Sequence, residues 1–135
     1  MPPLERVAAV VLDTHVWVWM AAGDERAEKL RGYAGRLILP AICVWETAML
    51  ATKGRLRLKP DVDTWVAQNL EAPVELEPLS AEISIRSSRL EDFHGDPADR
   101  LIVATALVLQ MPLVTADRQI HTWNRKTETL SLIEL

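Results

Sequence analysis

Three aspartates occupy positions from which their carboxylates could bind one metal ion. Asp13 follows a β-branched apolar run at residues 7–12, and Asp117 comes two residues after the strand-like segment 113–115. Asp99 falls in the first turn of an expected helix. Because ligands of parallel sheets bind at the carboxyl ends of the strands, we expect these side chains to lie at one edge. Carboxylates without a histidine or cysteine cluster are the ligands that Mg²⁺ and Mn²⁺ prefer.

A fourth acid, Glu46, interrupts an apolar surface. In the expected helix over residues 41–53 it shares a side with Ile42, Met49 and Leu50. An unpaired charge on such a surface is costly, so a bound cation or a basic partner would stabilise it. Each of the four acids also has a purely structural explanation, as a helix cap, a turn residue or a member of an ion pair.

The elements that must position these acids alternate between strand-like and helix-like segments. We expect strands at residues 7–12, 37–39, 74–76, 113–115 and 130–133, and helices at 15–22, 24–33, 41–53, 61–71, 80–93, 97–110 and 118–123. This alternation predicts a single α/β domain over residues 1–135. Its mostly parallel central sheet should have four or five short strands, with helices on both faces.

The composition is that of a soluble globular protein, with 49% hydrophobic and 25% charged residues. One cysteine allows no internal disulfide, and the longest uncharged run, residues 101–116, is too short and too polar to span a membrane. We therefore expect a cytoplasmic protein. The net charge of −4 disfavours sequence-independent binding to nucleic acid, but a carboxylate-rich nuclease site itself contributes negative charge.

Four segments of the chain resemble the signature blocks of PIN-domain proteins, and in particular of the VapC-type toxins of bacterial toxin–antitoxin pairs. They are residues 11–15, 41–46, 96–106 and 113–117, in the order and spacing of that family. The most specific part is Asp-Pro-x-Asp-Arg at residues 96–100, followed by Thr-x-Asp at residues 115–117.

The resemblance implies a metal-dependent endoribonuclease that hydrolyses structured RNA with Mg²⁺ or Mn²⁺. Asp13, Glu46, Asp99 and Asp117 correspond to the family's catalytic, metal-binding acids, and Thr115 to a small polar residue that supports them. The family also implies a VapB-like antitoxin as a partner, and a homodimer. In this mechanism bound metal generates hydroxide and stabilises charge on the phosphate.

Several other residues have both a functional and a structural interpretation. Lys53, Arg55 and Arg57 could follow RNA phosphates or form a solvated loop, and Arg100 could contact RNA or a neighbouring carboxylate. Trp17 and Trp45 could be core residues or partner contacts. The isolated histidines His15, His94 and His121 are weaker candidates as ligands.

Three other functions share parts of this pattern. A haloacid-dehalogenase-like phosphatase would need a second aspartate where the chain has His15. A related DNA nuclease would use the same metal chemistry, but such enzymes usually carry additional DNA-clamping segments. A non-enzymatic binding module could use the acidic pocket to capture a basic peptide.

Overall fold

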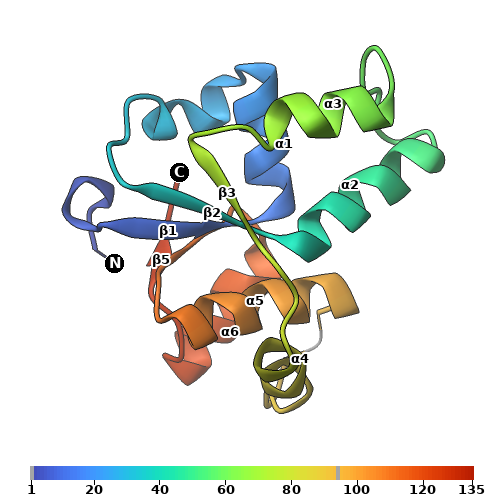
Figure 1. Ribbon diagram of the computed structural model, residues 1–135. Helices are drawn as coiled ribbons and strands as arrows, with labels where there is room; N and C mark the ends of the chain where they lie inside the picture. Colours follow the sequence, from blue (N-terminus) through green and yellow to red (C-terminus); the bar gives the residue numbers. More distant parts are fainter. Residues whose placement is uncertain (1, 94) are drawn as a thin grey trace.

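A sheet of five parallel strands runs through the computed structural model, which describes residues 2–93 and 95–135 (Figure 1). The strand order is β3-β2-β1-β4-β5. The strands are β1 (Ala9–Leu12), β2 (Arg36–Pro40), β3 (Val74–Glu77), β4 (Leu113–Val114) and β5 (Leu132–Ile133). The predicted fold class is confirmed, with every strand pair parallel.

Helices cover both faces of this sheet. Figure 1 shows α1 and α3 on one side of it and α5 and α6 on the other. The α-helices are α1 (Thr14–Ala22), α2 (Ala41–Thr52), α3 (Val62–Asn69), α4 (Ala81–Ser88), α5 (Pro97–Leu109) and α6 (Arg118–Thr127). Two short 3-10 segments, η1 (Leu4–Arg6) and η2 (Glu25–Leu30), complete the described elements. Within the described part of the chain, no helix is long and apolar enough to cross a membrane.

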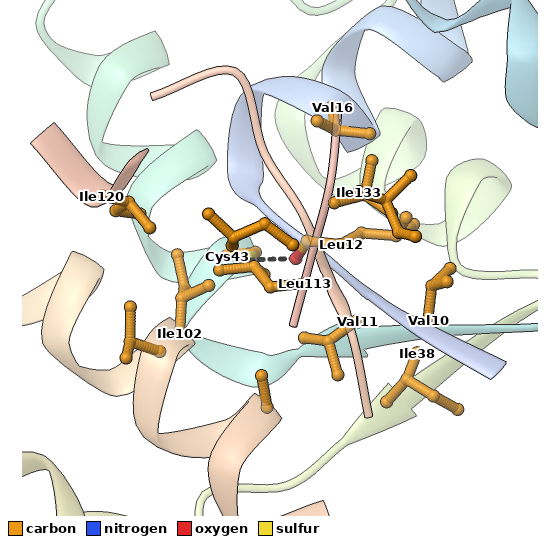
Figure 2. Close-up of a cluster of buried hydrophobic side chains, with 14 of the residues drawn as sticks. Val10, Val11, Leu12, Val16, Ile38, Cys43, Ile102, Leu113, Ile120 and Ile133 are labelled. Carbon is orange, nitrogen blue, oxygen red and sulfur yellow. Dashed lines mark hydrogen bonds between the residues drawn. The ribbon is translucent and has the colours of Figure 1, made fainter. Parts of the chain in front are cut away.

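The core surrounds the central strand β1. Val10, Val11 and Leu12 have no exposed surface, as expected for a parallel strand that is covered on both faces. Figure 2 shows these residues among side chains from neighbouring strands and helices, with the Cys43 thiol donating to the Leu12 carbonyl at 3.7 Å. This packing holds the carboxyl end of β1 in a fixed position.

The strand order changes direction at β1. Along the chain the sheet grows from β1 to β2 and β3 on one side, and then continues with β4 and β5 on the other. Such a switch point leaves a crevice at the carboxyl ends of the two central strands. Asp13 follows the last residue of β1, and Thr115 follows the last residue of β4, so both lie at this crevice.

The segment that the sequence predicts as a helix over residues 24–33 is the 3-10 segment η2 instead. Asp24 accepts hydrogen bonds from the backbone nitrogen of Arg26 at 2.9 Å and from its guanidinium at 3.0 and 2.7 Å. Ala27 then leaves helical geometry, with φ −107° and ψ 16°. This local ring of hydrogen bonds competes with an α-helical start.

Helix α4 ends at Ser88, five residues before the end predicted at residue 93. The chain beyond it is bound by distant side chains: Arg100 donates to the carbonyls of Leu90 and Phe93, and the Trp123 ring nitrogen donates to the Glu91 carbonyl at 2.9 Å. These carbonyls are therefore satisfied without helical hydrogen bonds, and residues 89–93 form a loop held by these contacts.

Candidate metal centre

Asp13 is a buried carboxylate held by two hydrogen bonds. It caps α1, accepting from the Thr14 backbone nitrogen at 2.7 Å, and it accepts from the Thr115 hydroxyl at 2.5 Å. Only 4% of the residue is exposed. Burial raises the pKa of Asp13 above its usual value, although the hydrogen bonds from Thr115 and Thr14 oppose the rise. A cation at this position would favour the ionised form.

Thr115 joins this carboxylate to the start of α6. Its hydroxyl oxygen accepts from the Asp117 backbone nitrogen at 3.0 Å, and its carbonyl oxygen is 2.8 Å from Nε2 of His121. Because a carbonyl only accepts, Nε2 of His121 must carry the proton. Asp117 in turn caps α6, accepting from the backbone nitrogens of Gln119 and Ile120 at 2.8 and 3.2 Å.

Glu46 reaches the same crevice from the second turn of α2. Its side chain is half-buried, and burial raises the pKa of the carboxyl. The charges of Asp96 and Asp13 raise this pKa further, whereas the Thr14 hydroxyl lowers it. Glu46 is thus partly withdrawn from water and lies near other acids, while the charge of His15 also lowers the pKa of its carboxyl.

Asp96 is a fifth acid at this site, and the sequence analysis did not name it as a site residue. Its carboxylate accepts from the Asp99 backbone nitrogen at 2.8 Å and so begins α5. One carboxylate oxygen from each of Asp96, Asp99 and Glu46 lies within 4.8 Å of the other two. The position of Asp96 in the Asp-Pro-x-Asp motif, one turn from Asp99, is the signal that could have identified it.

Gly95 permits the close approach of the loop to α5. A β-carbon at this position would lie 2.5 Å from the Phe93 ring and 3.0 Å from the β-carbon of Asp99. Both distances are shorter than van der Waals contact, so a side chain here would displace the loop that carries Asp96.

Asp99 experiences the charges of all the other acids. Its pKa is raised to about 7, first by burial and then by the charges of Asp96, Asp117, Asp13 and Glu46. The structure thus brings the four predicted acids together. Among the described residues, the ion pairs within 4.0 Å are Arg26–Asp24 and Arg36–Glu75, and neither involves these carboxylates.

The residues present fit a hydrated divalent cation. The Thr14 hydroxyl, at the start of α1, is fully buried and has no hydrogen-bond partner within 3.5 Å among the described atoms. It lies close enough to Glu46 to lower that carboxyl's pKa. A metal-bound water would satisfy this hydroxyl, and an all-carboxylate donor set suits Mg²⁺ or Mn²⁺.

The predicted basic residues do not all face the centre. Arg100 donates from its three guanidinium nitrogens to the carbonyls of Ser87, Leu90 and Phe93, at 3.1, 3.1 and 2.7 Å. It therefore holds the loop before Asp96, and we assign it that structural role. Lys53, Arg55 and Arg57 are exposed on the segment after α2. Lys53 lies about 10 Å beyond Glu46 along the helix axis.

The structure distinguishes the buried from the exposed side chains among the tryptophan and histidine candidates. Trp17 is 1% exposed, donates to the Asn69 carbonyl at 3.0 Å and packs edge-on against Trp65, so it is a core residue. Trp45 is 52% exposed. His15 is exposed on α1, whereas His94 lies outside the described residues.

Comparison with known proteins identifies a family and a related chain. A family model of the PIN domain matches residues 10–125. The chain is 35% identical over 120 residues to Ribonuclease VapC22 of Mycobacterium tuberculosis, covering 85% of this chain and 92% of that one.

Solved structures match the same fold. VapBC2 from Rickettsia felis, bound to a DNA fragment from its promoter, matches with a TM-score of 0.70, 16% identity and coverage of 93% and 98% of the two chains. A toxin–antitoxin complex from Klebsiella pneumoniae matches with a TM-score of 0.62, 20% identity and coverage of 80% and 86%.

Proposed function

The chain belongs to the PIN-domain family and, within it, to the VapC ribonuclease toxins, and on this premise we propose that it is a divalent-metal-dependent endoribonuclease that hydrolyses phosphodiester bonds in structured RNA. The observation that supports this best is the convergence of Asp13, Glu46, Asp99 and Asp117 on one crevice. We take residues 1–135 as one ribonuclease domain that acts in the cytoplasm.

The five carboxylates have different roles in this proposal. Glu46, Asp96 and Asp99 offer three oxygens close enough to share one cation. Asp13 is oriented by Thr115, and Asp117 is held at the start of α6. A bound Mg²⁺ or Mn²⁺ lowers the pKa of its water and stabilises charge on the phosphate. The chain's own residues thus ionise, hold the cation and orient water, and none acts as a covalent nucleophile.

RNA cleavage by the purified protein tests the proposal. Cleavage of a structured RNA should disappear in EDTA and return with Mg²⁺ or Mn²⁺. Asp13→Asn should be inactive, whereas Asp63→Asn, in the exposed first turn of α3, should retain activity. Undiminished cleavage in EDTA would contradict the metal mechanism. Cleavage of DNA in place of RNA would identify a DNA nuclease, and capture of a basic peptide without any hydrolysis would identify a binding module.

We also propose a VapB-like antitoxin as the partner of this chain. The acidic crevice attracts a basic side chain, because an arginine can form paired, charge-assisted hydrogen bonds with carboxylates. The exposed ring of Trp45, next to Glu46 on α2, offers an apolar contact beside the crevice. An antitoxin segment that uses both features would block access of RNA to the site.

Two copies of the chain form a homodimer in this proposal. Leu76, Leu79 and Ile85 are each about half exposed, on β3, the turn after it and α4. Burying these side chains against a second copy would remove apolar surface from water. Light scattering at micromolar concentration should give twice the mass of one chain, and the mass of a single chain would contradict the dimer.

Among the basic residues, Lys53, Arg55 and Arg57 remain proposed RNA contacts. They are exposed and follow the helix that carries Glu46.

A further inference from the structure

A groove of about 770 Å³ lies between α6 and the segment that includes β5. Arg118, His121 and Arg125 line it from α6, and Leu132 and Glu134 line it from the opposite side. Ala116, which directly precedes Asp117, also lines it. The groove therefore extends from the edge of the metal centre along the helix.

The α6 wall of this groove is basic. Arg118, His121 and Arg125 are spaced so that they share one face of the helix. Both arginines are exposed, and neither forms an ion pair within 4.0 Å in the part of the chain that the structure describes. The Arg125 guanidinium donates only to the Thr122 hydroxyl, at 3.4 Å. Two guanidinium groups are thus available for an anion, and the Glu134 carboxylate lies on the opposite side of the groove.

The groove is joined to the catalytic residues by short connections. Arg118 is adjacent in sequence to Asp117, and the His121 ring nitrogen donates to the carbonyl of Thr115, whose hydroxyl holds Asp13. Any change in the position of α6 therefore also moves Thr115 and Asp117. A polymer lying in the groove would pass directly beside the metal centre.

The location of these arginines matters because the centre itself repels RNA. Five carboxylates surround the crevice, and the chain has a net charge of −4. A phosphate backbone needs fixed cations close to the scissile bond if it is to approach such a site. Arg118 and Arg125 lie two helical turns apart, about 10 Å along the axis, which is far enough to contact separate phosphates.

We propose that the α6 groove binds the RNA backbone on one side of the scissile phosphate, with Arg118 and Arg125 contacting its phosphate oxygens. The inference rests on the proposed ribonuclease function and adds a path for the substrate. Arginine suits this role, because its planar donors bind phosphate in pairs. An RNA phosphate is favoured over an acidic peptide because Ala116, which lines the groove, directly precedes Asp117 of the proposed ribonuclease site.

Binding of a fluorescein-labelled RNA hairpin, measured by anisotropy with Mg²⁺ present, tests this path. All proteins carry Glu46→Gln to prevent cleavage. Adding Arg125→Gln should weaken binding by at least about threefold at low salt. It should also make the dependence of log K on log salt shallower by about 0.7–0.9 for the lost contact. Glu134→Gln removes the negative charge opposite the arginines and should strengthen binding.

Lys126→Gln is the matched control. Lys126 is exposed on α6 and loses the same charge, but it does not line the groove. It lines a neighbouring hollow, together with Trp123, Gly95 and Arg118. It should weaken binding less than Arg125→Gln does. Equal effects of the two variants, or no effect of Arg125→Gln, would overturn the groove as the RNA path. So would an Arg125→Gln variant that binds RNA normally but loses affinity for an acidic peptide.

Cleavage assays on proteins with native Glu46 test the RNA path and the ribonuclease function independently. If the wild type cleaves the hairpin and Arg125→Gln cleaves it equally well at subsaturating RNA, the path is wrong and the ribonuclease function stands. If the wild type cleaves no RNA with any divalent metal, both proposals fail.

Discussion

The Thr115 hydroxyl donates to the Asp13 carboxylate at 2.5 Å, joining two residues that lie 102 positions apart in the sequence. The same hydroxyl oxygen accepts from the Asp117 backbone nitrogen at 3.0 Å. One small side chain thus orients a carboxylate at the end of β1 and the start of the helix that follows β4. Residues that orient metal ligands in this way are as important to a site as its ligands.

Thr115→Val should reduce metal affinity and RNA cleavage by about 10- to 100-fold, because Asp13 loses the donor that orients it. The two side chains have the same shape, so the fold should remain. Thr115→Ser restores the hydroxyl and should restore activity. The loss should also move the pH dependence of cleavage to higher pH, because the Thr115 hydrogen bond lowers the pKa of Asp13. Calorimetric titration with Mn²⁺ and cleavage rates against pH are the measurements. Equal metal affinity in the valine and serine variants would contradict this role.

The metal-free protein should lose stability as the pH rises from about 4 to about 7. The pKa of Asp99 is about 7 in the folded chain against an ordinary value of 3.8, so the folded state binds the proton more tightly than the unfolded state. The free energy of unfolding then falls with pH across this window. The raised pKa values of Asp13 and Glu46 act in the same direction. Urea unfolding in EDTA at several pH values measures the slope.

Asp99→Asn should reduce this slope and stabilise the metal-free protein near pH 7, while it abolishes cleavage. Asp63→Asn on α3 is the control and should leave the slope unchanged. Saturating Mg²⁺ should raise the free energy of unfolding of the wild type at pH 7. It should raise that of Asp99→Asn much less, because the variant lacks one ligand. If Asp99→Asn melts several degrees below the wild type in EDTA, the carboxylate is a structural partner and not a ligand.

Arg100→Gln should destabilise the protein by roughly 2–4 kcal/mol, because three backbone carbonyls lose a charged donor. The loop that carries Asp96 would also be released, so cleavage should fall even where the variant is folded. Arg100→Lys supplies one ammonium group in place of the planar guanidinium, so it should recover little of the lost stability. Arg86→Gln, exposed on α4, is the control for charge. Unchanged unfolding midpoints in Arg100→Gln would contradict the assigned role.

Glu46→Gln should weaken binding of the antitoxin as well as remove catalysis, if a basic side chain of the partner enters the crevice. Glu71→Gln removes the same charge from an exposed position after α3 and should do neither. Titration calorimetry with the antitoxin's basic segment compares the two variants with the wild type. Equal affinities in all three proteins would show that the partner does not contact the acidic crevice.

The parts of this fold that the sequence predicted correctly are those determined by local patterns. The apolar run of β1 and the Asp-Pro start of α5 each carry their own signal. The early end of α4 could not be predicted in this way. It depends on Arg100 and Trp123, which lie more than ten residues away from some of the carbonyls that they bind.

Contacts with residues distant in the sequence also explain why the roles of Asp96 and Arg100 were not predicted. Asp96 has an ordinary local function as a cap, and its spacing from Asp99 is the one sequence signal of a second role. The distance between its carboxylate and that of Glu46 comes only from the fold. Arg100 next to Asp99 resembled a phosphate contact because the carbonyls that it binds are invisible in a sequence. For η2, the hydrogen bonds between Asp24 and Arg26 determine a tighter turn than the polar pattern indicated.

The position of β1 between β2 and β4 has a consequence for synthesis of the chain. An N-terminal fragment that ends before residue 113 contains Asp13, Glu46 and Asp99, but it lacks β4, Thr115 and Asp117. One whole side of the central strand then has no partner, and Asp13 has no hydroxyl to orient it. Because contacts this distant in sequence form late, an emerging chain on the ribosome has no complete candidate metal centre until residues 113–117 have been translated and β4 has paired with β1.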